Sequence, residues 1–346
     1  MKLTVHLEKN SYPIYIGSNI LRQADHYISE VFSGKKIFII SDDNVFPLYG
    51  ETLLHALSEY ECHSLVLPHG EPTKSFDSLP KIYEAMLQAK ISRSDLVIAL
   101  GGGVIGDLAG FAASSFLRGI PTSLLAQVDS SVGGKVAVDL PQGKNLVGAF
   151  YHPRLVLIDP KVLNTLPKRY ITDGMGEVIK YGCIKDAALF HTLKCCGSFE
   201  ALKPELSSVI ARCVDIKRLV VEQDQFDTGE RMLLNFGHTL AHTIEQYYHY
   251  ERESHGEAVA IGMYQITRIA ETLGLTSPGC AEELKAVLTA YGLPHASGLS
   301  IEDLTTAIKL DKKNLNNRLN LVLLHTIGDS YIHPSDVGFF QNAGTV

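Results

Sequence analysis

The sequence predicts an α/β domain in the first half of the chain and an all-α domain in the second. In the first half, short β-branched apolar runs alternate with helical patterns, as in a parallel sheet covered by helices. From about residue 172 to residue 310, the apolar periodicity is almost wholly helical. The length of 346 residues also favours two domains over one. We therefore place one domain at residues 1–165 and the other at residues 166–346.

The predicted strands of the first domain are short runs bounded by turn residues. They are Lys2–Leu7, Tyr12–Ile16, Lys36–Ile40, Ser64–Leu67, Leu96–Leu100 and Leu155–Asp159. Before the run that starts at Leu96, apolar residues recur at helical spacing from Leu79 to Leu87. This order of strand, helix and strand is the one expected for a parallel sheet.

The composition excludes several classes of protein. A formal net charge of -7 and the lack of a basic run argue against a nucleic-acid partner. No segment reaches the roughly 18 consecutive apolar residues of a membrane span, and the N-terminal residues alternate like a strand, unlike a signal peptide. The six cysteines form no C-x-x-C pair, as in intracellular proteins whose thiols are buried. We expect a cytoplasmic globular protein without a membrane partner.

A glycine-rich loop follows the predicted strand Leu96–Leu100. Residues 101–106 read G-G-G-V-I-G, so G-x-G-x-x-G lies between a buried strand and a helix. Such a loop either makes a tight turn or lets the backbone approach a pyrophosphate at the helix N-terminus, and we favour the second reading. Asp42, at the end of an earlier strand, is placed to accept the ribose hydroxyls of NAD. The first domain is thus interpreted as Rossmann-like and nucleotide-binding.

The stretch from Arg231 to His242 predicts a second functional element. On a single helix, Arg231, Asn235, His238 and His242 would lie within roughly 60° of one another, with apolar residues opposite. This face is either a surface in water or part of a site. Surface faces usually carry Lys and Glu, and this one has neither, so a site is equally consistent with the pattern.

Several long motifs in order resemble the 3-dehydroquinate synthases, within the sugar phosphate cyclases. The resemblance runs from about residue 36 to residue 313. Its motifs are G-E-x-x-K-S at residue 70, G-G-G-V-I-G-D at 101, L-L-A-Q-V-D-S-S-V-G-G-K at 124, G-K-N-L-V-G-A-F at 143, G-M-G-E-V-I-K-Y-G at 174, R-x-x-L-N-F-G-H-T-x-x-H at 231, H-G-E-A-V-A-I-G-M at 255 and D-K-K at 311. The resemblance implies a dehydroquinate synthase-like fold.

The resemblance also implies a metal site that binds zinc or cobalt. Its ligands would be Glu177, His238 and His255. Two imidazoles and a carboxylate leave positions open for substrate, as a catalytic zinc site requires. The metal would bind the substrate's hydroxyls and lower the pKa of the one being oxidised.

Further residues are implied as contacts of the substrate and of NAD. Contacts to the phosphate and ring hydroxyls would come from Lys135, Asn145, Lys180, His242 and Lys312. Lys217 and Arg231 would bind a carboxylate, which suits the guanidinium fork, and Asn235 belongs to the same set. Contacts to the dinucleotide would come from Asp42, Glu71, Lys74, Gly102, Gly103, Asp107, Thr122, Ser123, Leu125, Asp129, Lys144 and Thr165.

The implied reaction converts 3-deoxy-D-arabino-heptulosonate 7-phosphate to 3-dehydroquinate and phosphate, a step of the shikimate pathway. NAD would oxidise the substrate transiently, phosphate would leave, the hydride would return, and an intramolecular aldol reaction would close the ring. A cation-rich site suits this chemistry, because oxidation and elimination develop negative charge on oxygen. The resemblance further implies a homodimer.

The chain departs from the family pattern after Arg118. The segment between Arg118 and Thr122 is about five residues shorter than is usual in the family, and an apolar strand is predicted to be missing there. In addition, Ser123 replaces the usual threonine, and Gly176 the usual alanine. The presumed ligands are all retained.

Three alternative functions remain open on the sequence. A metal-dependent polyol dehydrogenase has a similar two-domain layout, but a neutral polyol offers nothing for Lys180, Lys217 and Arg231 to bind. Another sugar phosphate cyclase would act on a substrate without a carboxylate, against which the retained Arg231, Asn235 and His242 argue. A catalytically impaired homologue is supported only by the shortened segment after Arg118.

Overall fold

The computed structural model describes residues 1–8, 10–92, 94–114, 120–140, 143–300, 303–304, 319–336 and 338–341. The chain divides into two compact units. The first comprises Met1–Pro167 and Lys217–Glu222, and the second comprises Lys168–Ile216 and Gln223–Val346. Among the described residues, no helix combines the length and the apolar character that crossing a bilayer requires.

The first unit is built on a four-stranded parallel sheet of strand order β4-β3-β5-β6. Its strands are β3 (Lys36–Asp42), β4 (Glu61–Leu67), β5 (Leu96–Gly101) and β6 (Ile120–Pro121). The central strand β3 pairs with β4 and β5, and apart from Lys36 its residues are buried. A parallel strand that is covered on both faces needs apolar residues at successive positions, which explains the unbroken run I-F-I-I.

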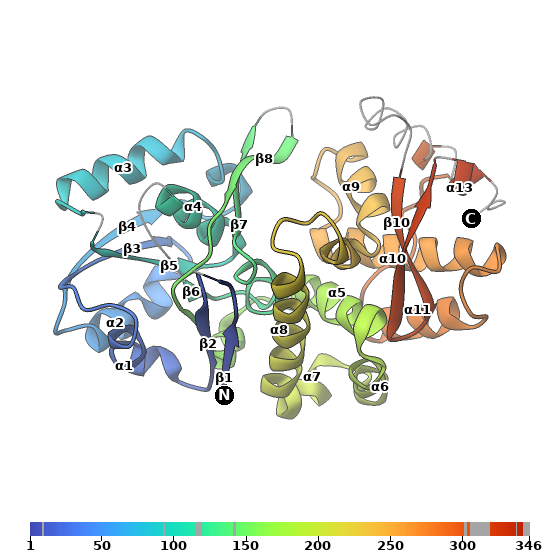
Figure 1. Cartoon of the computed structure of the whole chain (residues 1–346), viewed down its shortest axis with the longest axis horizontal. Helices are drawn as coiled ribbons and strands as arrows, with labels where there is room; N and C mark the ends of the chain where they lie inside the picture. The colour runs from blue at the N-terminus through green and yellow to red at the C-terminus, as the bar shows by residue number, and fades with distance from the viewer. Residues whose placement is uncertain are drawn as a thin grey trace. The chain divides into compact units, whose positions relative to one another are not determined.

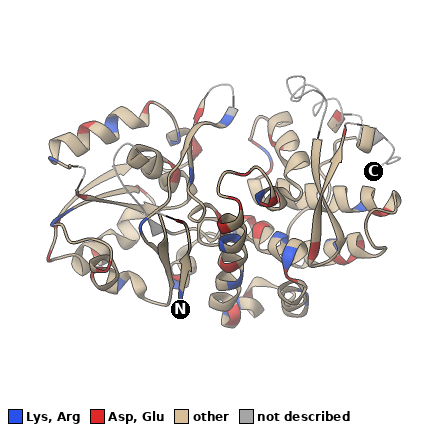
Figure 2. Ribbon diagram, in the orientation of Figure 1, with Lys and Arg blue, Asp and Glu red and all other residues tan. Residues whose placement is uncertain are grey.

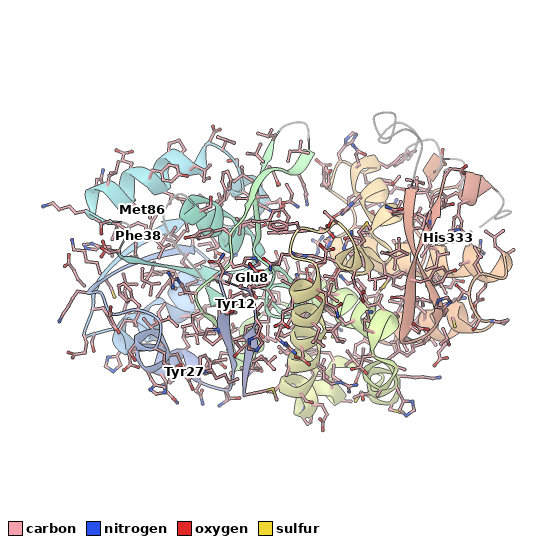
Figure 3. The ribbon with its side chains drawn as sticks, in the orientation of Figure 1. Glu8, Tyr12, Tyr27, Phe38, Met86 and His333 are labelled. Atoms are coloured by element: carbon pink, nitrogen blue, oxygen red, sulfur yellow. The ribbon has the colours of Figure 1, made fainter. Side chains whose placement is uncertain are left out.

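Helices cover both faces of this sheet (Figure 1). They are α1 (Ala24–Ser29), α2 (Phe46–Ala56), α3 (Ser78–Gln88) and α4 (Gly103–Ser114). Ile37 and Ile39 of β3 pack in the core beside α2, whereas Phe38 packs with Met86 of α3 in the core on the other face. Figure 3 shows Phe38 and Met86 next to each other in that layer. Successive strand residues point to opposite faces, so one strand supplies both cores.

Two smaller sheets complete the first unit. One has the strand order β1-β2-β9, made of β1 (Lys2–Val5), β2 (Tyr12–Ile16) and β9 (Val156–Ile158). The other is a hairpin of β7 (Lys135–Leu140) and β8 (Gly143–Phe150), which the sequence analysis did not predict. The short helical turns are η1 (Ile20–Gln23), η2 (Glu71–Thr73), the π-helical η3 (Ala126–Ser130) and η4 (Pro160–Thr165).

A strand does follow the shortened segment. The sequence analysis expected it to be missing, but Ile120–Pro121 forms the two-residue strand β6, which pairs in parallel with Leu100–Gly101 of β5. The amide of Thr122 also donates to the carbonyl of Gly101 at 2.7 Å. The sheet edge is therefore short rather than absent. Arg118 lies outside the described residues.

The second unit is mainly helical, as predicted. Its elements are α5 (Lys168–Lys185), α6 (Ala187–Cys196), α7 (Phe199–Leu202), η5 (Lys203–Glu205), α8 (Leu206–Gln223), η6 (Glu230–Asn235), α9 (His238–Tyr247), α10 (His255–Thr272), α11 (Cys280–Ala290) and α13 (Gly338–Gln341). Of α8, the residues Lys217–Glu222 group with the first unit. Most of α10 is buried, so it forms the core of the unit. Both acidic and basic side chains lie along α8 (Figure 2).

A two-stranded hairpin adds β-structure to the second unit, which the sequence analysis expected to be all-α. It consists of β10 (Leu319–Thr326) and β11 (Asp329–Ser335). Residues 321–324 of β10 are buried without interruption. Such a run has no period-two alternation, so its pattern does not distinguish a buried strand from a buried helix.

Candidate active site

Three side chains from three helices converge in the second unit. Glu177 lies on α5, while His238 and His255 are the first residues of α9 and α10. One ligand atom from each residue lies within 4.8 Å of the others. Glu177 Oε1 is 3.6 Å from His238 Nε2 and 3.7 Å from His255 Nε2. This set of two imidazole nitrogens and one carboxylate oxygen is suited to zinc or a similar transition metal.

The second nitrogen of each ring has its own acceptor. His238 Nδ1 lies 3.1 Å from the carbonyl oxygen of Phe236, and His255 Nδ1 lies 3.3 Å from Glu245 Oε1. An Nδ1–H that donates to these oxygens leaves a lone pair on each Nε2. Both rings therefore turn a metal-binding nitrogen toward Glu177.

Glu177 itself supplies the test of whether a metal fits. Its Oε2 accepts a hydrogen bond from Lys180, whereas its Oε1 is buried without a hydrogen-bond partner among the described residues. A buried carboxylate oxygen left unpaired costs free energy, and such atoms are rare in folded proteins. A cation between Glu177 Oε1 and the two Nε2 atoms would satisfy it. The residues present fit the metal.

The two histidines differ in protonation. Burial, together with the positive charge of Lys180, lowers the pKa of His238 well below its ordinary value, so this ring is neutral. Burial also disfavours the charge of His255, but the hydrogen bond and charge of Glu245 outweigh it and raise the pKa of His255 to about 9. A metal therefore meets one neutral imidazole and one from which it must displace a proton.

The prediction of a single helix from Arg231 to His242 was wrong. The 3₁₀ turn η6 ends at Asn235, and Gly237 then adopts a left-handed conformation with φ 80°. A Cβ on Gly237 would lie 2.6 Å from Cγ of Met263, so the turn also needs glycine for close packing on α10. Only His238 and His242 share a helix, because the chain changes direction between η6 and α9.

Because the chain turns at Gly237, the four residues predicted to share one helix face lie in different surroundings. The rings of His238 and His242 are 5.6 Å apart at their centroids, and His242 lies 6.3 Å from the ring of His255. Arg231 is buried and donates from Nη1 to the carbonyl of Gln225 at 2.7 Å. Asn235 is exposed at the end of η6. His242 thus lies beside the metal ligands His238 and His255. Lys180 lies beside the ligand Glu177, to which it donates a hydrogen bond.

The glycine-rich loop of the first unit borders a cavity. β5 ends at Gly101 and α4 begins at Gly103, as the sequence predicted. The lining of the cavity includes Gly102, Gly106, Asp107, Ser130, Ser131, Gly134 and Lys135. Among the residues that the structure describes, a Cβ built on Gly106 meets nothing within 4 Å. Packing within the protein therefore does not require glycine at this position. A ligand that approaches the backbone closely would require it, because a side chain would occupy the same space. The loop fits a dinucleotide pyrophosphate.

A cluster of ionic side chains adjoins this cavity. Lys74 Nζ lies 2.6 Å from Asp107 Oδ2 and 2.5 Å from Asn145 Oδ1. Lys144 Nζ lies 3.6 Å from Glu71 Oε1. Burial raises the pKa of Asp107; burial also opposes the charge of Lys74, but Asp107 holds the pKa of Lys74 above its ordinary value. The structure thus brings together predicted nucleotide contacts and Asn145, a predicted substrate contact.

Lys217 and Asp129 form a second link between predicted contacts. Lys217 Nζ donates to the carbonyl oxygen of Asp129 at 2.7 Å and lies 2.9 Å from Oδ1 of the same residue. The resemblance implied a substrate carboxylate for Lys217 and the dinucleotide for Asp129. Although Lys217 lies on α8, beyond the expected domain boundary, it groups with the first unit.

The remaining predicted nucleotide contacts are also engaged locally. Asp42 Oδ1 accepts hydrogen bonds from the amides of Asn44 and Val45, which leaves Oδ2 for a ribose hydroxyl. Ser123 Oγ accepts from the amide of Ala126 at 3.3 Å. Thr122 directly precedes Ser123, and Leu125 directly precedes η3. Thr165, at the end of η4, contacts the hydroxyl of Tyr49. Lys312 lies outside the described residues.

Two carboxylates beside the metal ligands were not predicted. Glu245 contacts the ring of His255, and Asp173 Oδ1 accepts a hydrogen bond from the amide of Gly256 at 2.6 Å. Each has a signal in the sequence. Glu245 follows His238 by two helical turns, and Asp173 precedes Glu177 by one.

Comparison with known proteins identifies the family of this chain. Residues 64–173 match the sequence model of the 3-dehydroquinate synthase N-terminal region, and residues 174–314 match that of the C-terminal region. The chain belongs to the 3-dehydroquinate synthase family. It is 56% identical over 348 residues to a 3-dehydroquinate synthase of Clostridium beijerinckii, with 98% of this chain and 99% of the relative covered. A 3-dehydroquinate synthase of Clostridium perfringens is 55% identical over 349 residues, with the same shares covered.

Solved structures share the fold. A 2-epi-5-epi-valiolone synthase from Streptomyces hygroscopicus subsp. jinggangensis, with NAD+ and Zn2+ bound, is 27% identical with a TM-score of 0.88, covering 98% of this chain and 97% of that one. A 2-deoxy-scyllo-inosose synthase, 24% identical with a TM-score of 0.87 and 99% of each chain covered, shares the fold alone. A glycerol dehydrogenase from Schizosaccharomyces pombe has a lower TM-score of 0.60 at 16% identity, covering 95% and 87%. This chain is thus closer in fold to the two synthases than to the glycerol dehydrogenase.

Proposed function

We propose that this protein converts 3-deoxy-D-arabino-heptulosonate 7-phosphate to 3-dehydroquinate and phosphate, as a carbon–oxygen lyase of the shikimate pathway. The observation that carries the proposal is the convergence of Glu177, His238 and His255 around a buried, unpaired carboxylate oxygen. Near-complete coverage of a 3-dehydroquinate synthase at 56% identity supports the same reaction.

A metal ion at Glu177, His238 and His255 would lower the pKa of a bound substrate hydroxyl and stabilise negative charge on oxygen. We favour zinc or cobalt, and the zinc bound by the related valiolone synthase supports this choice. Lys180 is buried against Glu177 and donates a hydrogen bond to Oε2 of that residue. His242 offers a further ring nitrogen beside the ligands. Both can donate hydrogen bonds to substrate oxygens as charge develops on them.

NAD in the cavity at the glycine-rich loop would accept a hydride from the substrate and later return it. The first amides of α4 would donate to its pyrophosphate, and the N-terminal end of the helix favours that negative charge. Asp42 would accept from the adenosine ribose. Asp107, which lines the same cavity and pairs with Lys74, would present a polar side chain to the dinucleotide, and Lys74 also contacts Asn145.

The remaining cationic and polar groups would orient the substrate. We assign the phosphate to Lys135, Asn145, His242 and Lys312, and the carboxylate to Arg231, Lys217 and Asn235. Fixing one flexible substrate near its reaction geometry lowers the entropic part of the barrier for elimination and for ring closure. Arg231 supports this role, because burial and the bond to Gln225 hold its planar guanidinium in one orientation.

We propose different binding roles for the two halves of the chain. Residues 1–165 would bind NAD and also supply Lys135 and Asn145 to the substrate, and residues 166–346 would bind the metal and most of the substrate. We further expect a homodimer in the cytoplasm. Light scattering coupled to size-exclusion chromatography tests the assembly, since a monomer would contradict it.

Redox balance tests the proposed reaction. Purified protein is incubated with the heptulosonate phosphate, NAD and zinc, and phosphate and NADH are both measured. We expect phosphate to appear without net NADH, because the hydride returns to the substrate within each turnover. NADH that accumulates in proportion to product would instead indicate a polyol dehydrogenase, and absence of phosphate release would indicate an impaired homologue.

A further inference from the structure

We propose that Glu245 is a positioning residue for the metal, because its hydrogen bond to His255 holds that ring with Nε2 directed at Glu177. This inference rests on the proposed metal site. It concerns a residue that does not itself reach the ligand atoms but acts through one of them.

Glu245 lies on the Nδ1 side of the His255 ring, away from the nitrogen that would bind the metal. Its Oε1 lies 3.3 Å from His255 Nδ1, and its side chain is only 6% exposed. The residues come from different helices, since Glu245 lies on α9 and His255 begins α10. Glu245 follows His238 by seven positions, so both lie on the same side of α9. One face of α9 thus provides a ligand and the group that orients a second ligand.

An imidazole has two neutral tautomers, and only one of them presents Nε2 as a lone pair. A carboxylate that accepts from Nδ1–H selects this tautomer and increases the basicity of Nε2. The hydrogen bond also fixes the rotation of the ring about its side chain. Without Glu245, His255 would spend part of its time in orientations and tautomers that do not bind the metal.

The other histidine offers a contrast within the same site. His238 Nδ1 faces the backbone carbonyl oxygen of Phe236, an acceptor that no side-chain substitution removes. Glu245 is therefore the acceptor through which the orientation of one ligand can be changed while its partner is left intact.

A purely structural role for Glu245 makes a different prediction. A buried carboxylate at the end of α9 could serve only to hold α9 against the start of α10. Its removal would then lower the stability of the protein but leave the zinc affinity of the folded molecules unchanged. Metal affinity, measured on folded protein, distinguishes the two roles.

The experiment compares three variants of the full chain in metal-free form. Glu245→Ala removes the acceptor, and Glu245→Gln keeps an acceptor oxygen but removes the charge. Glu257→Gln is the matched control, because Glu257 is a carboxylate on the same helix as His255 that bonds the amide of Ser254 at 2.8 Å. Zinc affinity is measured by competition with a chromophoric chelator above pH 9, where His255 is neutral with or without Glu245, and Co2+ absorption spectra report the ligand geometry. Thermal unfolding without metal reports stability.

We expect Glu245→Ala to weaken zinc binding about 10–100-fold, as is typical when such a partner is lost, and to alter the Co2+ spectrum. Glu245→Gln should weaken binding by about three- to tenfold, since a hydrogen bond to a neutral acceptor is weaker. Glu257→Gln should match the wild type.

Wild-type affinity and an unchanged spectrum in Glu245→Ala, whatever its stability, would overturn the inference. If that variant does not fold, wild-type affinity in Glu245→Gln would overturn it. Failure of the wild-type protein to bind zinc would overturn the proposed metal site instead, so the two failures are distinguishable.

Discussion

A Cβ atom on Gly176 would lie only 2.6 Å from the carbonyl oxygen of Gly256. Gly176 directly precedes the ligand Glu177, and Gly256 directly follows the ligand His255. The backbones of α5 and α10 therefore approach each other where each helix carries a metal ligand. The close approach of the two helices therefore depends on glycine at position 176.

We expect Gly176→Ala to lower the free energy of unfolding by roughly 1–3 kcal/mol, the usual cost of forcing extra volume into a packed contact. The added methyl group should also push α10 away from α5. This movement should weaken zinc binding, because it displaces His255 relative to Glu177. Chemical denaturation and chelator competition measure the two effects. Unchanged stability would mean that the two helices separate here without cost.

Gly106→Ala should have the opposite profile. A Cβ at Gly106 meets no atom of the described residues within 4 Å, and alanine favours a helix over glycine by roughly 0.5–1 kcal/mol. Thermal stability should be unchanged or higher. The methyl group should nevertheless weaken NAD binding, since Gly106 lines the cavity. Calorimetric titration with NAD provides the check, and wild-type affinity would place the dinucleotide elsewhere.

Lys217→Met should impair NAD binding as well as substrate binding. The substitution keeps most of the side-chain volume but removes both hydrogen bonds to Asp129. Charge-assisted hydrogen bonds contribute roughly 1.5–3 kcal/mol, so NAD affinity should fall on the order of tenfold if Asp129 loses its position. Lys217→Arg is the control that retains the charge. A rise in KM for substrate with unchanged NAD affinity would show that Asp129 is held without Lys217.

Zinc binding near neutral pH should release about one proton. His255, with a pKa of about 9, is protonated in the metal-free protein and must lose its proton to coordinate, whereas His238 is already neutral. The apparent affinity should therefore rise by roughly tenfold per pH unit up to about pH 9. Calorimetry in buffers of different ionisation enthalpy counts the protons. Release of two protons would mean that His238 is also charged.

The same group makes the metal-free protein sensitive to alkali. The pKa of His255 is raised from 6.5 to about 9 on folding, so its protonation stabilises the folded state fully below pH 6.5. That contribution is lost as the pH rises through 9. Denaturation of metal-free protein across this range should show the decline, and His255→Gln should remove it.

Local patterns predicted the parts of the fold that depend on neighbouring residues. The run I-F-I-I of β3 and the strand–glycine–helix order around Gly101 follow directly from β-branched residues and backbone freedom. Local patterns failed at β10, where uninterrupted burial hides the strand period, and at Gly237, where a helical wheel cannot register one left-handed residue.

The residues of the site were predictable only in part, because the site brings together residues that are far apart in the sequence. Glu177, His238 and His255 are distant in sequence, so only the resemblance identified them as a set of ligands. The distances between them became known only from the folded structure. The pairing of Lys217 with Asp129 joins residues 88 positions apart. Nothing in either local segment indicates that pairing. The hydrogen bond of Glu245 to His255 likewise depends on how α9 packs against α10.

The assignment of Lys217–Glu222 to the first unit affects how this gene could be divided. The polypeptide passes between the units after Pro167, after Ile216 and after Glu222, so neither unit is one continuous stretch of sequence. A fragment that ends at Pro167 would lack the lysine that binds Asp129 and the carboxylate of Glu222 that accepts from the amide of His6 at 2.6 Å. Domain exchange between family members should therefore carry the α8 segment along with the nucleotide-binding half.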